Sequence, residues 1–274
     1  MAEQLSKTWF ITGASRGLGR AWATAALERG DRVALAVREA EAVVDLVGRF
    51  GDAALPVTLD VTDRQAALAG ITLAHKVFGR LDVVVNNAGF VLTGAAEELS
   101  EDDVRAQFET NTFGVIWVVQ AALPVLRAQG AGHILNVSSL SGVSAFANSS
   151  LYSASKWAVE GFSQALRLDV KHLGIRVTVI EPGPYDTELY SSMRKPASTI
   201  PDYQSARERA QSGSGELHQG GNITASAQAI LAVVDAPDPP LRILLGGHRA
   251  FVAADYESRL AEWNEWEDVS AAAG

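Results

Sequence analysis

Tyr152 and Lys156 are two residues whose types and spacing could support acid–base chemistry. If the surrounding run 149–161 is a helix, side chains four residues apart lie on one face, one turn from each other. A phenol has an unperturbed pKa of about 10 and is a poor proton donor or acceptor at neutral pH. A neighbouring ammonium favours the phenolate and lowers that pKa, which suits the phenol to acid–base catalysis. The same spacing is common on surface helices, so other parts of the chain must decide between the two interpretations.

A glycine-rich turn near the N-terminus could bind a dinucleotide. The β-rich run 8–12 leads into this turn, and apolar residues at helical spacing follow over 21–27. Gly13 permits a tight turn, Gly17 lets the backbone approach a phosphate, and Gly19 allows close packing of helix on strand. The N–H groups of the following helix would then face a pyrophosphate. The spacing is G-x-x-x-G-x-G rather than the common dinucleotide fingerprint, so the turn alone is only suggestive.

The residues after the second predicted strand, 32–37, indicate the type of dinucleotide. Arg38 follows this strand directly, and Arg16 lies in the glycine turn. Two guanidinium groups favour a ribose 2′-phosphate through charge-assisted hydrogen bonds. The alternative takes Glu39 as the acid that binds the ribose hydroxyl of NAD. The two arginines favour NADP(H) over NAD(H).

Further predicted strands alternate with helices, at 54–59, 81–85, 133–137, 176–180 and 242–245. This rhythm predicts a doubly wound, mostly parallel sheet of about seven strands with helices on both faces, a Rossmann-like single domain over residues 1–274. Polar motifs follow the strand ends and should therefore meet at one edge of the sheet, where such folds bind ligands. These motifs are the glycine turn, Asp60, Asn87, Ser139 and Thr187.

Two of the polar residues have ordinary structural alternatives. Asp60 could cap or turn the chain into the next helix. Asn111 lies in the apolar, mostly helical run 99–128, where an unpaired amide would cost about 1–3 kcal/mol. It could orient a water or a lysine, or it could bond a local carbonyl.

Composition limits the classes of function. The chain has 274 residues, 47% hydrophobic and 20% charged, with a formal net charge of −9 and no cysteine. An acidic chain is a poor partner for nucleic acid. The five histidines show no ligand spacing, so we expect no metal site. We find neither a signal-peptide pattern nor an apolar run of the roughly 18 residues that span a bilayer. We therefore expect a cytoplasmic protein without a membrane partner.

The C-terminal third departs from the strand–helix rhythm. Residues 191–222 are rich in Ser, Gly, Arg and Gln, and we expect a substrate lid within 188–224, with a plain surface loop as the alternative. A helical extension is expected over 250–274, where Val252, Tyr256, Leu260 and Trp263 form an apolar stripe. This stripe could cap the substrate pocket, contact a partner subunit or pack into the core.

The motifs taken together resemble the short-chain dehydrogenase/reductase family, in its shorter single-domain branch. They occur in the family's order over about residues 6–248. Singly they are weak, whereas the complete set is specific. The residues that carry the resemblance are 12–19, Asp60, 86–89, Asn111, Ser139, 152–156 and Pro182-Gly183.

The resemblance implies a catalytic group of Asn111, Ser139, Tyr152 and Lys156. Tyr152 would exchange a proton with the substrate oxygen, and Ser139, thirteen residues before it, would hydrogen-bond that oxygen. Lys156 would lower the phenol's pKa and bind the nicotinamide ribose. Asn111 would hold a water that links Lys156 to solvent.

The resemblance and the residue chemistry also predict the binding residues. The substrate would contact Ser139, Tyr152 and Tyr185. Pro184-Tyr185 departs from the family, which often has an aliphatic residue at the second position, and the bulky Tyr185 could narrow the substrate pocket. The predicted cofactor-binding residues are Gly13, Ser15, Arg16, Gly17, Leu18, Gly19, Arg38, Asp60, Val61, Asn87, Ala88, Gly89, Asn111, Tyr152, Lys156, Pro182, Gly183, Tyr185 and Thr187.

We therefore expect an NAD(P)-dependent oxidoreductase that acts on the carbonyl or secondary alcohol of a hydrophobic small molecule, as a homodimer or homotetramer. The alternatives are a non-catalytic NADP-sensing regulator of the same fold and a dehydratase or epimerase. A hydrolase is poorly supported because no G-x-S-x-G elbow is present around residues 138–142. The expectation of a hydrophobic substrate rests on the apolar and aromatic residues near the predicted site, Leu140, Val143, Phe146, Tyr185, Leu189 and Tyr190.

Overall fold

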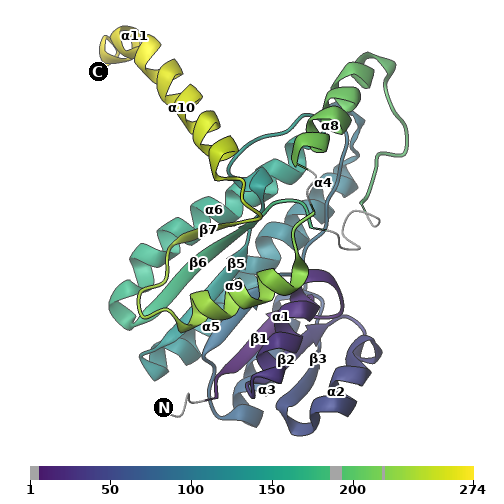
Figure 1. Ribbon diagram of the computed structural model, residues 1–274, viewed down its shortest axis with the longest axis vertical. Coiled ribbons are helices and arrows are strands. Elements are labelled where there is room, and N and C mark those ends of the chain that lie inside the picture. The colour runs from purple at the N-terminus through teal and green to yellow at the C-terminus, as the bar shows by residue number, and fades with distance from the viewer. Residues whose placement is uncertain (1–5, 186–192, 218–219) are drawn as a thin grey trace.

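Seven parallel strands form one sheet at the centre of the computed structural model, which describes residues 6–185, 193–217 and 220–274 (Figure 1). The strand order is β3-β2-β1-β4-β5-β6-β7, so the winding direction reverses between β1 and β4. In open sheets of this kind, ligands bind outside the carboxyl ends of the strands at such a reversal. The strands are β1 (Thr8–Thr12), β2 (Arg32–Val37), β3 (Ala54–Thr58), β4 (Val83–Asn86), β5 (Gly132–Val137), β6 (Ile175–Pro182) and β7 (Arg242–Leu245).

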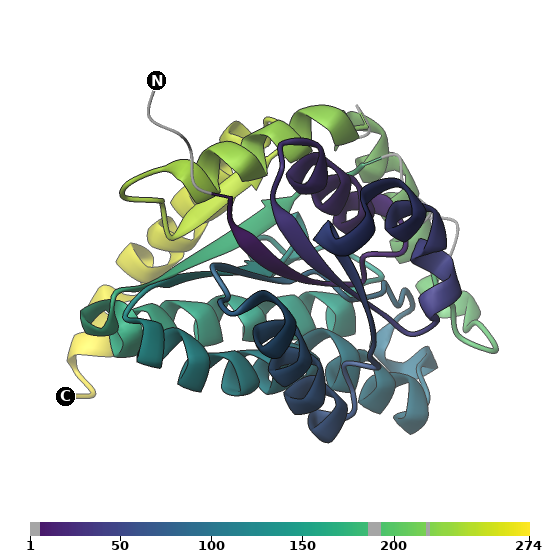
Figure 2. The same ribbon diagram turned by 90° about the horizontal axis from the view of Figure 1, so that it is seen from below.

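Helices cover both faces of the sheet, as the strand–helix rhythm predicts. Figure 2 shows α1 and α9 on one face and α3, α5 and α6 on the other. The prediction of a single-layer parallel sheet between two helical layers is thus confirmed. The helices are α1 (Gly17–Glu28), α2 (Val44–Phe50), α3 (Arg64–Phe78), α4 (Glu101–Phe108), α5 (Gly114–Gln129), α6 (Ser150–Val170), α8 (Gln204–Leu217), α9 (Ile223–Asp235), α10 (Arg249–Glu265) and α11 (Glu267–Ala271).

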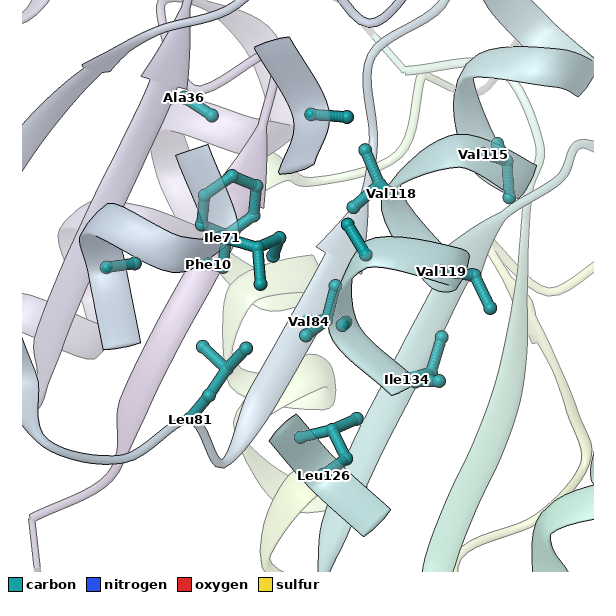
Figure 3. Close-up of a cluster of buried hydrophobic side chains, with 14 of the residues drawn as sticks. Phe10, Ala36, Ile71, Leu81, Val84, Val115, Val118, Val119, Leu126 and Ile134 are labelled. Carbon is teal, nitrogen blue, oxygen red and sulfur yellow. The ribbon is translucent and has the colours of Figure 1, made fainter. Parts of the chain in front are cut away.

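The strands alternate their side chains between two hydrophobic cores. Val84 packs in the core beneath α3 and α5 (Figure 3), while Val83 and Val85 pack in the core beneath α1 and α9. Phe10 belongs to the first core, and its neighbour Trp9 belongs to the second. A strand that is buried on both faces needs apolar residues at every position, which explains the continuous apolar runs in the sequence.

The helical run after β4 contains an irregularity that the sequence does not predict. Between α4 and α5 the chain forms a π-helical turn, Glu109–Phe113, with Asn111 at its middle. By length and composition the whole run Glu101–Gln129 could cross a membrane. Half of its most apolar stretch is buried inside the protein, however, and core helices of soluble proteins pass the same test. The run is therefore weak evidence for a membrane span.

Part of the predicted irregular segment is helical. The expectation of an irregular chain over 191–222 is wrong for α8, whose fourteen residues are mostly polar. The Ser-Gly composition suggested a loop, but Arg and Gln are good helix formers. Residues 186–192 and 218–219 lie outside the described part of the chain. A lid function for 188–224 remains a prediction.

The C-terminal extension is helical, as predicted, and projects from the body of the protein (Figure 1). Its first turns are attached to the loop after β5, since Phe251 stacks on Phe146 with ring centroids 5.6 Å apart. Arg259 donates a hydrogen bond of 3.2 Å to Val143 O. Farther along, Trp263 is 68% exposed. Core packing of the whole apolar stripe is therefore wrong, because Tyr256, Leu260 and Trp263 are exposed.

Candidate active site

A cavity of about 840 Å³ lies along the carboxyl ends of the strands. It brings together nearly all of the residues that the sequence marks. Gly19 and Asn111 are not among the described residues of its lining, and Thr187 lies outside the described residues. The predicted site residues that line the cavity are Gly13, Ser15, Arg16, Gly17, Leu18, Arg38, Asp60, Val61, Asn87, Ala88, Gly89, Ser139, Tyr152, Lys156, Pro182, Gly183 and Tyr185.

The glycine turn is held to the end of β4 by an exchange of hydrogen bonds. Asn87 Nδ2 donates to Thr12 O and Gly13 O at 3.0 and 3.1 Å. In return, Thr12 Oγ1 accepts from the N–H groups of Asn87 and Ala88, both at 3.0 Å. A Cβ added to Gly19 would lie 2.3 Å from Asn87 Nδ2 and 2.5 Å from Gly13 O. Gly19 therefore shapes the turn from behind, without lining the cavity.

Two arginines and one carboxylate lie at the predicted adenosine end. Arg38 directly follows β2, Arg16 precedes α1, and both line the cavity. Glu39, the alternative ribose acid, is not among the described lining residues. Asp60 Oδ1 accepts hydrogen bonds from the N–H and hydroxyl of Thr62, at 2.9 and 2.8 Å. The turn interpretation of Asp60 thus holds alongside its place in the cavity wall.

Tyr152 and Lys156 both lie on α6, one turn apart, and are 8% and 5% exposed. Lys156 Nζ donates a hydrogen bond of 2.8 Å to Val137 O, at the end of β5. Burial lowers the pKa of Lys156 to about 8, while the nearby charge of Glu160 opposes this shift. The lysine is therefore still mostly an ammonium at neutral pH, held at a fixed position beside the cavity.

Ser138 and Ser139 follow β5 and both line the cavity, but their surroundings differ. Ser138 is buried, and a Cβ added to Gly142 would lie 2.2 Å from its Oγ. Ser139 is half-buried and begins a short helical turn, where its Oγ accepts from Ser141 N at 3.1 Å. A substrate oxygen in the cavity has easier access to Ser139 than to Ser138.

Asn111 joins the loop after Gly89 to α6. Its Nδ2 donates to Phe90 O at 3.0 Å and to Ser155 Oγ at 3.2 Å, while its Oδ1 accepts from Phe90 N at 3.1 Å. A π-helical turn often marks a functional position, and here it turns this amide inward. A Cβ added to Gly89 would lie 3.1 Å from Asn111 Oδ1 and 3.6 Å from Lys156 Nζ. Of the interpretations open for Asn111, bonding to a local carbonyl is therefore present.

The opposite end of the cavity contains residues that the sequence did not mark as site residues. Arg194 stacks its guanidinium over the Phe90 ring, 4.2 Å from the centroid. Tyr185 lines the cavity, but its ring also packs against Gly221 and the core beneath α1. Leu189 and Tyr190 lie outside the described residues. The newly found lining residues come from distant segments and share no spacing; they include Phe90, Met193, Arg194, Arg209 and Phe251.

A doubly wound sheet with a glycine turn at its switch point and a buried Tyr-x-x-x-Lys pair on the same cavity defines a class of dinucleotide-dependent enzymes. The family model for short chain dehydrogenases matches residues 7–198. The chain therefore belongs to the short-chain dehydrogenase family, and it is an oxidoreductase of that family.

Relatives match the chain over nearly its whole length. The oxidoreductase BOA17 of Botryotinia fuckeliana (strain B05.10) is 41% identical over 98% of this chain and 99% of its own. A short-chain dehydrogenase structure from Streptomyces avermitilis has a TM-score of 0.90 and 37% identity, covering 99% of this chain and 100% of that one. The structure of ElxO with NADP bound has a TM-score of 0.76 and 26% identity, covering 89% and 98%. The first two matches are long enough to include the projecting helix α10.

Proposed function

We propose that this oxidoreductase acts as a ketone reductase or alcohol dehydrogenase, transferring a hydride between a nicotinamide cofactor and the carbonyl or secondary-alcohol carbon of a hydrophobic small molecule. One observation carries the proposal. Tyr152 and Lys156 are buried one turn apart on α6, in the wall of the same cavity that the glycine turn lines. A cavity that joins a dinucleotide turn to an acid–base pair suits hydride transfer coupled to proton transfer.

Tyr152 is the proposed acid and base. In reduction its O–H gives a proton to the carbonyl oxygen, and in oxidation its phenolate takes the proton of the alcohol. Lys156 stabilises the phenolate by its charge, which the hydrogen bond to Val137 O keeps in place. Ser139 donates a hydrogen bond to the same substrate oxygen. When bound, the cofactor supplies the hydride that adds to the substrate carbon.

Asn111 is proposed to position this group rather than to react. Its amide fixes Phe90 and, through Ser155, the turn of α6 between Tyr152 and Lys156. A water held beside Asn111 would link Lys156 to solvent and return the proton that Tyr152 gives away.

We propose NADP(H) as the preferred cofactor. The residues of the cavity fit a dinucleotide with a 2′-phosphate, because Arg16 and Arg38 line the adenosine end and Glu39 is absent from the described lining. Gly13 and Gly17 have φ of +66° and +56°, which lets the bare backbone approach a pyrophosphate. ElxO, which was solved with NADP bound, has the same fold.

The remaining predicted contacts divide between the two ends of the cofactor. Asp60 and Val61 would contact the adenine, and Asn87, Ala88 and Gly89 would adjoin the adenosine-side ribose. Pro182, Gly183 and the Tyr185 N–H would hold the carboxamide.

The substrate end and the outer surface support two further parts of the proposal. Phe90, Phe146 and Phe251 give the cavity an aromatic end, which favours a hydrophobic substrate.

Phe113 stacks on Trp117 at a ring distance of 6.1 Å and is 40% exposed beside α5. We take this exposed aromatic surface as support for a homodimer or homotetramer. With no cysteine in the chain, we place the protein in the cytoplasm.

The test is a panel of ketones, aldehydes and secondary alcohols, with NADPH or NADP⁺ consumption followed by absorbance. We expect turnover of apolar ketones or alcohols, and none with substrates that lack a carbonyl or hydroxyl group. A protein that binds NADPH tightly but turns over no member of a broad panel would instead fit the non-catalytic regulator. NADH supporting turnover as well as NADPH would overturn the cofactor preference alone.

A further inference from the structure

A cluster of charged side chains lies behind the cavity wall and has no part in the reaction proposed above. Glu160 on α6 and Glu181 on β6 are 5% and 3% exposed. Arg242 on β7 approaches both, with its Nε 3.0 Å from Glu160 Oε2 and 3.5 Å from Glu181 Oε1. The two carboxyl groups therefore meet at a single N–H group.

The cluster holds more negative charge than its hydrogen bonds can satisfy. Arg242 also donates to Gln164 Oε1 at 2.8 Å, away from the two acids. Within the described part of the chain, Oε1 of Glu160 and Oε1 of Glu181 are buried without a hydrogen-bond partner. Two adjacent buried carboxylates repel each other, and one proton removes both the repulsion and an unsatisfied oxygen.

Electrostatics indicates which acid holds the proton. Burial raises the pKa of Glu181 to about 7, and the charge of Glu160 raises it too, whereas Arg242 opposes both effects. Burial also raises the pKa of Glu160, but hydrogen bonds from Ser138 and Arg242 and the charge of Lys156 lower it. Glu160 is thus better stabilised as the anion.

The cluster adjoins three parts of the catalytic wall. Glu160 lies one turn after Lys156 on α6, and Glu181 directly precedes Pro182. Ser138 Oγ lies 3.5 Å from Lys156 O, which joins the end of β5 to the same turn of α6. His248 packs against Gly183, two residues beyond Glu181. A change of charge at the cluster would therefore act on the lysine and on both neighbouring strand ends.

We propose that Glu160 and Glu181 share one proton, carried by Glu181 on the acid side of neutrality, and that ionised Glu160 is a positioning residue for Lys156. The positioning role rests on the function proposed above, whereas the shared proton stands by itself. The single remaining negative charge balances Arg242 and keeps Lys156 in its ammonium form beside Tyr152.

The shared proton makes stability depend on pH in a defined direction. The pKa of Glu181 is raised from 4.5 in the unfolded chain to about 7 in the folded protein. Its contribution to stability is therefore complete below 4.5 and is lost as the pH rises through about 7.

Infrared difference spectroscopy of the intact protein tests the shared proton directly. Between pH values below and above 7, the wild type should lose the C=O band of one buried protonated carboxyl group. Glu181→Gln should lack this band and show a flatter decline of the melting temperature with pH. In Glu160→Gln the band should vanish at a lower pH, because its repulsive neighbour is gone. Glu101→Gln, in an exposed pair with Arg105 on α4, is the control and should match the wild type.

A wild-type spectrum without that band, or a band that persists in Glu181→Gln, would overturn the shared proton. The wild-type spectrum decides even if a variant does not fold.

The positioning role has its own measurement. In Glu160→Gln the lysine loses its stabilising anion, so the pH profile of alcohol oxidation should move upward by roughly half a unit or more. An unmoved profile would refute the positioning role. A protein with the infrared band but no oxidoreductase activity would refute the proposed function and the positioning role, while the shared proton would stand.

Discussion

The two ends of the cavity are built in different ways. At the adenosine end, short segments at the ends of β1, β2 and β4 are held together by hydrogen bonds that involve their backbone groups, and Gly19 leaves no room for a methyl group. At the substrate end, long side chains come from distant segments, as in the stack of Phe146 on Phe251 and that of Arg194 on Phe90. The first end is determined by sterics and the second by side-chain identity.

This difference separates what is common to such enzymes from what is particular to this chain. A turn that must bring backbone N–H groups to a phosphate tolerates few residues. A pocket lined by side chains from a loop and a projecting helix can change one residue at a time. Substitutions at the adenosine end should therefore affect every substrate equally, whereas those at the substrate end should affect substrates selectively.

Gly19→Ala should have the largest effect on cofactor binding. The new Cβ would lie 2.3 Å from Asn87 Nδ2 and would break the hydrogen bonds between the glycine turn and β4. Overpacking of this kind costs about 1–3 kcal/mol of folding stability. We expect both the melting temperature and the NADPH affinity, measured by fluorescence titration, to fall. The resulting loss of activity should be the same for all substrates.

Gly48→Ala is the matched control for that variant. Gly48 lies exposed in α2, and a Cβ added there meets no described heavy atom within 4 Å. Alanine should stabilise the protein by about 0.5–1 kcal/mol through helix propensity, without a change in NADPH affinity. If NADPH affinity fell by a similar factor in both variants, the tight packing at Gly19 would not be the cause of the loss.

Arg38→Ala should have the next largest effect, and it should fall on one cofactor. Loss of a charge-assisted hydrogen bond to the 2′-phosphate costs about 1.5–3 kcal/mol, or roughly 10- to 100-fold in affinity. NADH lacks that phosphate and should bind nearly as well as to the wild type. Equal losses for NADPH and NADH, compared by titration, would contradict the assignment of Arg38.

Phe251→Ala should have the smallest effect and should be selective. Its ring stacks on Phe146 at the substrate end, and an aromatic pair of this kind contributes about 0.5–1.5 kcal/mol. We expect KM for bulky ketones to rise a few-fold, while the Kd for NADPH stays constant. Trp263→Ala, on the exposed part of the same helix, should change neither value. A change in NADPH affinity in Phe251→Ala would contradict the claim that substrate-end residues act on the substrate and not on the cofactor.

The fold could be predicted because a strand buried on both faces leaves a continuous apolar run. β1, β2 and β7 begin and end where the sequence predicts, and the other strands differ by a residue or two. The adenosine end could be predicted for a related reason, since the glycines and Asn87 answer a local geometric requirement. Spacing drew attention to Tyr152 and Lys156, but only the resemblance to a family joined them with Asn111 and Ser139 into one catalytic group, and its roles remain predictions.

Other features depend on contacts that no spacing reveals. In the π-helical turn, the amide of Asn111 bonds Phe90, which lies in another loop. Glu160 and Glu181 are ordinary acids in the sequence and become a pair only when β6 lies beside α6. Phe251 is brought to the cavity by a helix that projects from the body and whose Trp263 is exposed.

The central claim is that Tyr152 exchanges the proton that accompanies hydride transfer. Tyr152→Phe keeps the ring in its buried place on α6 and removes only the hydroxyl group. With a ketone that the wild type reduces, kcat should fall about 10²- to 10⁴-fold. The Kd for NADPH, measured by fluorescence on the same preparation, should stay within about twofold, because the phenol contributes at most one of many contacts. Wild-type kcat in Tyr152→Phe, with NADPH bound normally, would contradict the account.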